Sequence, residues 1–507
     1  MGCAAGAPAG PCAVKRVGRG VVAAVLALEL AVVAGLTWRG LSGAPREAPW
    51  TFHRLPAPWV RPDDVGRPIS DTVSGITMFR GNATRTFYGR GPVPRRPEIL
   101  WRYPNGRPMC AVSYVGRLAP LWCGNGWTGQ PSVVEREDGT EVIFGAYDRQ
   151  IHFLDGASGR ERRPSFSTGD IIKGSVSVDP DGYPLLYSGS RDNFFRVIAL
   201  DRSRPTELWR LSAADAPRPL WNDDWDGNAV IIDDYLFEGG ENGWFYIVKL
   251  NRSYDERGRV QVAPQVLVRQ PSFDDSLLAA LHDEEVSIEN SPAVFGYRTY
   301  FANSGGAVWG LDLTQLRSDP RLVTPVFRYW TGDDTDASIV VDEQGNLYVA
   351  SELQRFNRRS AAVGQLVKLD PRRRGDPRVW GIHIPQGHGE KQGGMWATPA
   401  LFGRMLFVAT NSGRLLGVDR DSGLIRWERP LPPHAWSSPV VVDSTLIVAD
   451  CEGTVHAFDV RRPAEKPPVL WEFRLPSGAC IESTPAVWRG RIYFGARDGY
   501  LYAIGDR

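Results

Sequence analysis

The chain has 507 residues, of which 42% are hydrophobic and 23% are charged, and these proportions exclude a disordered or fibrous protein. Its 59 basic and 58 acidic residues give a formal net charge of +1, which excludes the strongly basic surface typical of nucleic-acid-binding proteins. Its 54 glycines and 39 prolines indicate a chain rich in turns, and this favours an all-β protein.

The first segment of the chain predicts a membrane anchor. Residues 21–38 form an apolar run interrupted only by Glu29, and three basic residues precede it. The run has about the minimum length of a membrane-spanning helix, and its short leader favours a cytoplasmic N-terminus. We expect a cytoplasmic tail over residues 1–19 and an uncleaved transmembrane signal anchor over residues 20–38, with the remainder of the chain on the periplasmic or extracellular side of the cell membrane. A cleaved signal peptide is the alternative interpretation.

A linker is expected after the anchor. Residues 39–75 are rich in proline and arginine and show no hydrophobic periodicity, a composition typical of extended linkers. From residue 76 onwards, strand-like runs alternate with turn residues up to the C-terminus. We therefore predict a single folded domain over residues 76–507.

Eight copies of one strand unit make up this domain. Each copy contains a strand, a turn, a second strand, a glycine-containing hairpin and a third strand, often followed by a fourth. The residue marking the start of the first strand recurs at Pro131, Val176, Asn228, Pro292, Ser338, Pro399, Pro439 and Pro485. Four short strands in about 40–50 residues is the period of a propeller blade. The repeats therefore predict an all-β, eight-bladed β-propeller with four-stranded blades.

The eighth copy ends after three strands, and the start of the domain supplies the missing one. Residues 99–103 resemble the fourth strands of other copies, and pairing them with the last blade would close the ring and remove two open sheet edges. Four tryptophans share one blade position, where we expect each to pack against the neighbouring blade. They are Trp101, Trp209, Trp427 and Trp471.

Two stretches of sequence carry a resemblance to a known family. The opening motif Met78-Phe79-Arg80-Gly81-Asn82 and the strand–turn–strand segments 418–427 and 499–504 resemble bacterial propellers built from pyrroloquinoline-quinone (PQQ)-type repeats. The resemblance implies a PQQ-like propeller, and its members include PQQ-dependent dehydrogenases, BamB-like propeller lipoproteins of outer-membrane protein assembly, and anchored propellers of unassigned role.

The resemblance leaves function open between an enzyme and a binding module. The dehydrogenases hold PQQ and Ca²⁺ and often carry two adjacent cysteines, and this chain has no Cys-Cys pair. We therefore expect a membrane-anchored binding or scaffold module of the cell envelope, with a protein or an envelope polymer as its partner and no nucleic acid. A PQQ-dependent dehydrogenase is the alternative. Loop insertions at residues 252–286 and 352–364 are expected to supply specificity.

One column of positions is predicted to line the mouth of the central channel. It consists of the residues three before each strand marker: Thr128, Lys173, Trp225, Glu289, Thr335, Trp396, Trp436 and Glu482. All except the two threonines are candidate cofactor-binding residues, because aromatic rings and charges together can bind a planar anionic ligand. The alternative is a wet, polar channel mouth whose tryptophans only pack on the next blade.

A candidate calcium loop lies in the third copy. Asn222, Asp224 and Asp226 alternate and Gly227 follows, as at the start of a Ca²⁺-binding loop. The twelfth position is Asp233, where such loops carry glutamate. The alternative is a turn in which these side chains bind their own backbone.

Two further groups of residues leave their roles open. His383, His388 and Glu390 lie in a glycine-rich segment, where a solvated loop is favoured over a metal site. The cysteines at positions 110, 123, 451 and 480 can form disulfides outside the cytoplasm, and the sequence does not decide whether they do.

Overall fold

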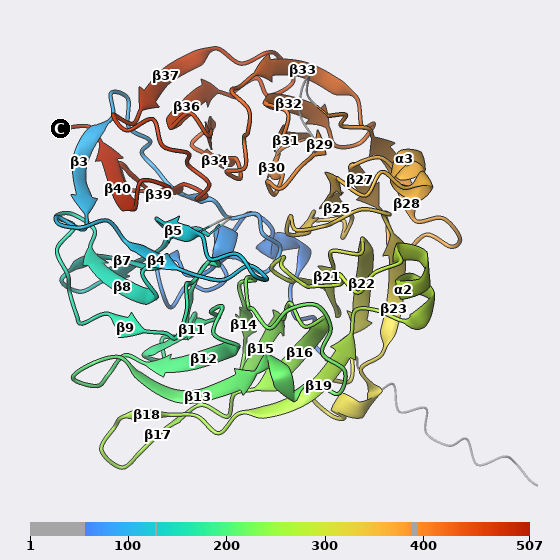
Figure 1. Cartoon of the computed structure of the whole chain (residues 1–507), viewed down its shortest axis with the longest axis horizontal. Helices are drawn as coiled ribbons and strands as arrows, with labels where there is room; N and C mark the ends of the chain where they lie inside the picture. Colours follow the sequence, from blue (N-terminus) through green and yellow to red (C-terminus); the bar gives the residue numbers. More distant parts are fainter. Residues whose placement is uncertain (1–55, 127–128, 387–392) are drawn as a thin grey trace, which may run out of the picture. The chain divides into compact units, whose positions relative to one another are not determined.

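The computed structural model describes residues 56–126, 129–386 and 393–507. Eight sheets of four or five strands surround a common axis (Figure 1), which confirms the predicted eight-bladed propeller. The predicted tail and anchor, residues 1–38, lie outside the described residues. Within the described part of the chain, no helix is both long and apolar enough to cross a bilayer.

The first four blades follow one another along the chain. Blade 1 contains β1 (Gly75–Ile76), β6 (Ser132–Arg136), β7 (Gly139–Gly145), β8 (Gln150–Asp155) and β9 (Phe166–Ser167). Blade 2 contains β10 (Ser177–Val178), β11 (Leu185–Ser188), β12 (Phe194–Ala199) and β13 (Thr206–Ser212). Blade 3 contains β14 (Val230–Ile232), β15 (Tyr235–Gly239), β16 (Trp244–Lys249) and β19 (Gln265–Pro271). Blade 4 contains β20 (Ala293–Phe295), β21 (Arg298–Ala302), β22 (Ala307–Asp312) and β23 (Pro325–Trp330).

The other four blades complete the circle. Blade 5 contains β24 (Val340–Val341), β25 (Leu347–Ala350), β27 (Leu366–Leu369) and β28 (Arg378–Ile382). Blade 6 contains β30 (Ala400–Phe402), β31 (Met405–Ala409), β32 (Arg414–Asp419) and β33 (Ile425–Pro430). Blade 7 contains β34 (Val440–Val442), β35 (Thr445–Ala449), β36 (Thr454–Asp459) and β37 (Val469–Arg474). Blade 8 contains β2 (Gly89–Arg90), β38 (Ala486–Trp488), β39 (Arg491–Ala496), β40 (Tyr500–Gly505) and β3 (Glu98–Tyr103).

Short elements decorate the blades. Three two-stranded ribbons pair β4 (Cys110–Val112) with β5 (Leu121–Cys123), β17 (Ser253–Tyr254) with β18 (Val260–Gln261), and β26 (Glu352–Leu353) with β29 (Gly393–Gly394). The helices are α2 (Asp275–Leu281), α3 (Arg358–Val363) and the 3₁₀ turns η1 (Pro62–Asp64), η2 (Phe79–Gly81), η3 (Ala213–Asp215) and η4 (Pro320–Leu322). The two predicted loop insertions therefore contain β17, β18 and α2 in one case and β26 and α3 in the other.

The two ends of the domain pair in blade 8, as predicted. Strand β3 runs antiparallel to β40, with Trp101 opposite Ala503, and β2 runs parallel to β38. In Figure 1, the blue β3 accordingly lies beside the red β40. The last blade thus takes its fourth strand from the start of the domain, which leaves no open blade edge at the junction.

The predicted tryptophans join each blade to the next. The indole nitrogen donates to a carbonyl oxygen of the following blade in three cases: Trp101 to Gly156 (3.1 Å), Trp427 to Pro463 (2.9 Å) and Trp471 to Pro94 (2.8 Å). Trp209 is half-buried and packs on a core that includes blade 3. Trp380, which the sequence comparison did not single out, makes the same bond to Arg420 (3.1 Å). These contacts satisfy the indole N–H while burying its ring between blades.

A ring of hydrogen bonds, here called the hydroxyl ring, joins the innermost strands. At the start of each strand a backbone N–H donates to a hydroxyl of the next blade: Gln130 to Ser175 (2.7 Å), Asn228 to Ser291 (3.1 Å), Ser291 to Ser338 (2.9 Å), Ser338 to Thr398 (3.0 Å) and Thr398 to Ser438 (3.0 Å). Between blades 8 and 1, the N–H of Thr484 donates to the carbonyl of Gly129 (3.0 Å). The ring explains the Ser/Thr-Pro dipeptides of the repeat, because the hydroxyl links blades where proline begins the strand.

The opening motif of the domain fills the centre of the ring. Arg80 donates to the carbonyl oxygens of Thr398 (2.7 Å) and Pro439 (2.9 Å). Arg85 donates to those of Pro292 (2.6 Å) and Asn228 (2.9 Å). Both arginines are fully buried, and burial lowers the pKa of Arg85 to about 9. We call residues 79–85 the axial plug, since its two arginines bind four of the eight blades.

The segment preceding the plug is packed rather than extended. The compact unit begins at Ala57, although the sequence assigns residues 39–75 to a linker. Trp59 is buried, donates to the carbonyl of Leu313 (3.2 Å) and carries the guanidinium of Arg317 over its ring. Val60 pairs with Gly296 as a β-bridge. The dense prolines of this segment hide the few apolar residues that attach it to the propeller.

Candidate functional site

The structure shifts two members of the predicted column by one residue. In the hydroxyl ring, Asn228 and Ser338 occupy the position immediately before the strand marker, and not the marker itself. Counting three residues back from the true markers replaces Trp225 by Asp226 and Thr335 by Asp336. Because a slip of one residue moves a strand's side chains to the opposite face, this correction changes the chemistry of the site.

Trp225 and Thr335 accordingly belong to the core. Trp225 is 1% exposed, its ring lies between those of Phe195 and Tyr246 (centroids 5.7 and 5.4 Å away), and its indole donates to a backbone carbonyl. Thr335 is fully buried and its hydroxyl lies 2.9 Å from that of Ser351. Trp225 is therefore unsuited to the cofactor-stacking role predicted for it.

Lys173 lies among carboxylates of blade 3. Its ammonium forms an ion pair with Asp226 and lies 3.7 Å from Glu241 Oε1. Burial lowers the pKa of Lys173, but the charges of Asp226, Glu241 and Glu289 outweigh burial and hold it well above its usual value. Lys173 is thus a fixed positive charge inside a ring of negative ones.

The predicted calcium loop is occupied by side-chain cations. Arg191 pairs with Asp224 and Lys173 pairs with Asp226. The amide nitrogen of Asn222 donates to Asp224 Oδ2 (3.0 Å) and to Glu241 Oε2 (2.7 Å). Burial, followed by the charge of Asp226, raises the pKa of Asp224 to about 7. A calcium ion here would have to displace both cations, so the arrangement favours a self-contained polar network over the predicted Ca²⁺ site.

A second carboxylate group in blade 5 has no such counter-ions. Asp334, Asp336 and Glu352 are buried, and one oxygen of each lies within 4.8 Å of the others. Asp334 accepts from the amide of Gln354 (2.7 Å). One oxygen of each carboxylate accepts no hydrogen bond from the described residues. Burial, then repulsion between neighbouring carboxylates, raises the pKa of all three well above the usual range.

Oxygen donors of this kind suit protons or a hard divalent cation. Three buried carboxylates cannot all remain ionised without a compensating charge. Carboxylate oxygens are the ligands that Ca²⁺ and Mg²⁺ take up in proteins. Among the described residues, this group therefore fits a divalent cation better than the predicted loop at residues 222–226 does.

The remaining members of the column are aromatic or acidic. Trp396 and Trp436 stack with ring centroids 4.4 Å apart, and His434 stacks on Trp436 at 4.6 Å. Glu289 accepts from the hydroxyl of Ser287 (2.8 Å), and burial raises its pKa. Thr128, like His388 and Glu390, lies outside the described residues, and His383 is exposed.

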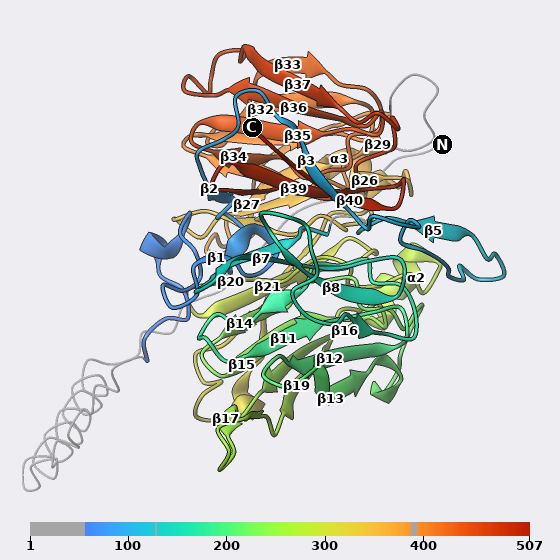
Figure 2. The ribbon, with the colours of Figure 1, turned by 90° about the vertical axis from the view of Figure 1, so that its left-hand side faces the viewer.

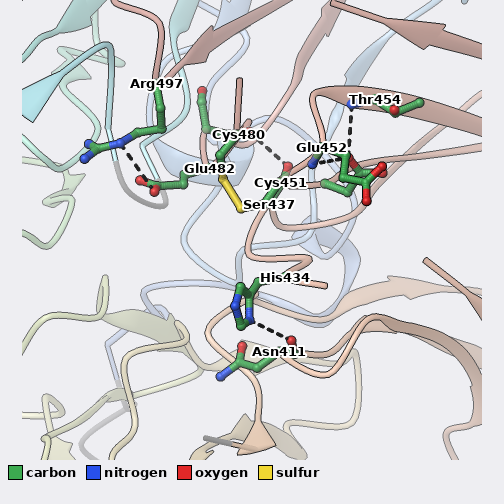
Figure 3. The surroundings of a disulfide bond; sticks show 11 residues. Asn411, His434, Ser437, Cys451, Glu452, Thr454, Cys480, Glu482 and Arg497 are labelled. Carbon is green, nitrogen blue, oxygen red and sulfur yellow. Dashed lines mark hydrogen bonds and ion pairs between the residues drawn. A yellow bond between two sulfur atoms is a disulfide. The ribbon is translucent and has the colours of Figure 1, made fainter. Parts of the chain in front are cut away.

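Glu482 lies beside one of two disulfides. Both cysteine pairs are bonded, Cys110 to Cys123 and Cys451 to Cys480, which answers the question that the sequence left open. Figure 3 shows Glu482, two residues after Cys480, directed towards Arg497, whose Nε lies 3.6 Å from its carboxylate. Burial raises the pKa of Glu482, and the charge of Arg497 opposes this.

Glu241 and Glu352 were missed by the sequence reasoning, although they share a position. Each is the second residue after the second strand of its blade, β15 or β25. In an antiparallel blade this position lies beside the start of the first strand, where the column is. Asn411 and Cys451 occupy the same position in blades 6 and 7. A second column counted from the ends of the second strands would have revealed them.

The described residues do not fit PQQ alone. PQQ is a planar polycarboxylate, and the region around the column is dominated by carboxylates. Its described cations are already paired: Lys173 with Asp226 and Arg497 with Glu482. The stacked pair Trp396–Trp436 offers an aromatic surface, but the charge around it favours a positive ligand group over the planar anionic ligand expected from the sequence.

Comparison with known proteins agrees with the fold. Residues 363–505 match a PQQ-repeat family model described as outer membrane protein assembly factor BamB, which confirms the resemblance to PQQ-type repeats. Quinohemoprotein alcohol dehydrogenase from Comamonas testosteroni is similar with a TM-score of 0.58 at 12% identity, over 87% of this chain and 81% of that one. A europium-containing methanol dehydrogenase gives 0.52 at 14% identity, over 85% and 98%.

Other comparisons add little. BamB from Moraxella catarrhalis gives a TM-score of 0.38 at 10% identity, over 81% of this chain and 98% of that one. The search of curated protein sequences gave no match. At these identities the likenesses show the propeller fold alone, and function has to be argued from the site.

Proposed function

We propose that the protein is a membrane-anchored, extracytoplasmic propeller that acts as a binding or scaffold module of the cell envelope. Its two disulfides support an oxidising compartment. The axial plug, the hydroxyl ring and the interblade tryptophans support a rigid disc, and a rigid surface binds without the cost of ordering itself.

One observation supports the kind of partner. Each carboxylate group has an exposed aromatic side chain beside it in the chain: Trp221 (58% exposed) precedes Asn222, and Phe356 (51%) follows Arg355, whose N–H donates to Asp333 (3.1 Å). Acidic groups flanked by exposed aromatic rings suit a partner that presents basic and apolar side chains. A protein segment of this composition is the partner that we propose.

The test is site-specific photo-crosslinking in intact cells. A photoreactive amino acid at position 221 or 356 of the full chain should capture the same protein, and one at Leu424, an equally exposed apolar position (57%) next to the outer strand β33, should not. The complex should dissociate as salt rises, because charge pairing contributes to it. Equal capture at all three positions, or at none, would contradict the proposed surface.

The alternative function, a PQQ-dependent dehydrogenase, is separated from this proposal by one assay. The purified full chain is mixed with PQQ and Ca²⁺ and tested for cofactor absorbance and dye reduction with alcohols and sugars. Because the described cations of the column are already paired, we expect neither signal. Dye reduction that depends on added PQQ would replace the binding proposal.

A further inference from the structure

The β4–β5 ribbon forms a stiff hairpin that projects from the blades. The disulfide between Cys110 and Cys123 closes its base. Val115 and Leu118 exchange both backbone hydrogen bonds (2.9 and 3.0 Å) around a two-residue turn, Gly116-Arg117. Figure 2 shows the ribbon carrying β5 extending beyond the neighbouring blades. A hairpin closed at its base and tight at its tip presents its side chains in a fixed arrangement.

Large apolar side chains cover this hairpin although they face solvent. Five of them lie within ten residues: Val112 (41% exposed), Tyr114 (66%), Val115 (46%), Leu118 (72%) and Leu121 (64%). Singly exposed apolar residues are normal on protein surfaces, but such a concentration marks a surface that binds something. The two most exposed aliphatic residues, Leu118 and Leu121, lie on the outgoing strand from the tip.

The charge of the hairpin is of one sign. No aspartate or glutamate occurs between Glu98 and Glu135. Arg107 and Arg117 are exposed, and Arg117 stands at the tip itself. At the base, Arg149, with 43% of its side chain exposed, donates to the carbonyl of Val112 (2.6 Å). The ligand that complements this surface is both apolar and negatively charged.

We propose that the tip of this hairpin inserts into the headgroup region of an anionic lipid bilayer. Aliphatic side chains at the tip would enter the acyl boundary, while Tyr114 and Arg117 are residue types that settle at headgroup level. Basic residues near an anionic bilayer each contribute attraction. A protein groove would also cover apolar residues, but the absence of carboxylates and the arginine at the tip favour phosphate-bearing lipid. The proposal stands apart from the binding function above.

Depth-dependent fluorescence quenching tests the proposal and does not depend on the anchor. The full chain carries a fluorescent amino acid at position 118 or, as a matched control, at Leu424 (57% exposed). It is reconstituted into vesicles of phosphatidylcholine, with or without phosphatidylglycerol, containing lipids spin-labelled near the headgroup. We expect strong quenching at position 118 in phosphatidylglycerol vesicles, weaker quenching without it, and none at position 424.

Charge reversal at the tip provides the second measurement. R117E exchanges one attraction for one repulsion and alters only an exposed turn residue, so the fold is retained. At about tenfold per two charges near an anionic surface, it should lower the ratio of inserted to free hairpin about tenfold. Equal quenching at positions 118 and 424 would overturn the proposal. So would shielding of position 118 in native membranes but not in vesicles, which would assign the hairpin to a protein partner.

Discussion

Removal of a single hydroxyl from the hydroxyl ring is predicted to destabilise the propeller. Ser338 is buried, and its oxygen accepts the N–H of Ser291 across the boundary between blades 4 and 5 at 2.9 Å. In Ser338→Ala this buried N–H loses its acceptor. An unsatisfied buried donor costs about 1–3 kcal/mol. We expect the free energy of unfolding to fall by about that amount, well beyond the change at a surface serine.

The assay is urea unfolding of the full chain in mild detergent, followed by tryptophan fluorescence. Ser203 is exposed in a turn, and Ser203→Ala is the matched control, expected to change stability by less than about 0.5 kcal/mol. A Ser338→Ala variant as stable as this control would refute the reasoning that interblade hydroxyls hold the ring together. A Ser338→Thr variant that keeps most of the stability would support it.

Three more predictions follow from described contacts. A Cβ at Gly417 would lie 2.1 Å from the Trp427 ring, so Gly417→Ala should lower the free energy of unfolding by about 1–3 kcal/mol in the same urea assay, and an unchanged midpoint would contradict this. Lys173→Met leaves buried carboxylates, Asp226 among them, without their cation and should cost about 3–5 kcal/mol at pH 8 but less at pH 5, where they can protonate; an equal loss at both pH values would count against it. Burial raises the pKa of Glu238 to about 8, so its contribution to stability is lost as pH rises from about 4.5 to 8. Glu238→Gln should therefore gain stability relative to the natural chain over that interval in thermal melts, and parallel melting curves would refute the assignment.

Most of the fold was predictable from the sequence because the repeat is enforced by packing. The Ser/Thr-Pro dipeptides mark where the hydroxyl ring and the first strand meet, and blades that contain one were placed in the correct register. Blades 3 and 5 have Asn228-Ala229 and Ser338-Ile339 instead. Without proline to mark the strand start, the count slipped by one residue in both, and Trp225 replaced Asp226 in the predicted column.

Other parts of the site depend on contacts that no local pattern records. Asp226 and Lys173 come from different blades, so their pairing requires the closed ring. The role of Arg80 was hidden for the same reason, since the opening motif binds carbonyls more than 300 residues away in the chain. The packing of Trp59 was obscured by the prolines around it.

The junction in blade 8 also sets an order of events for a newly made chain. Strand β3 ends at Tyr103, and its partner β40 ends at Gly505. At about 5–20 residues per second, roughly 20–80 s separate the emergence of the two strands. During that interval an apolar edge bearing Trp101 stays open to other chains. A cell that makes this protein therefore has to shield the first strand until the last one arrives.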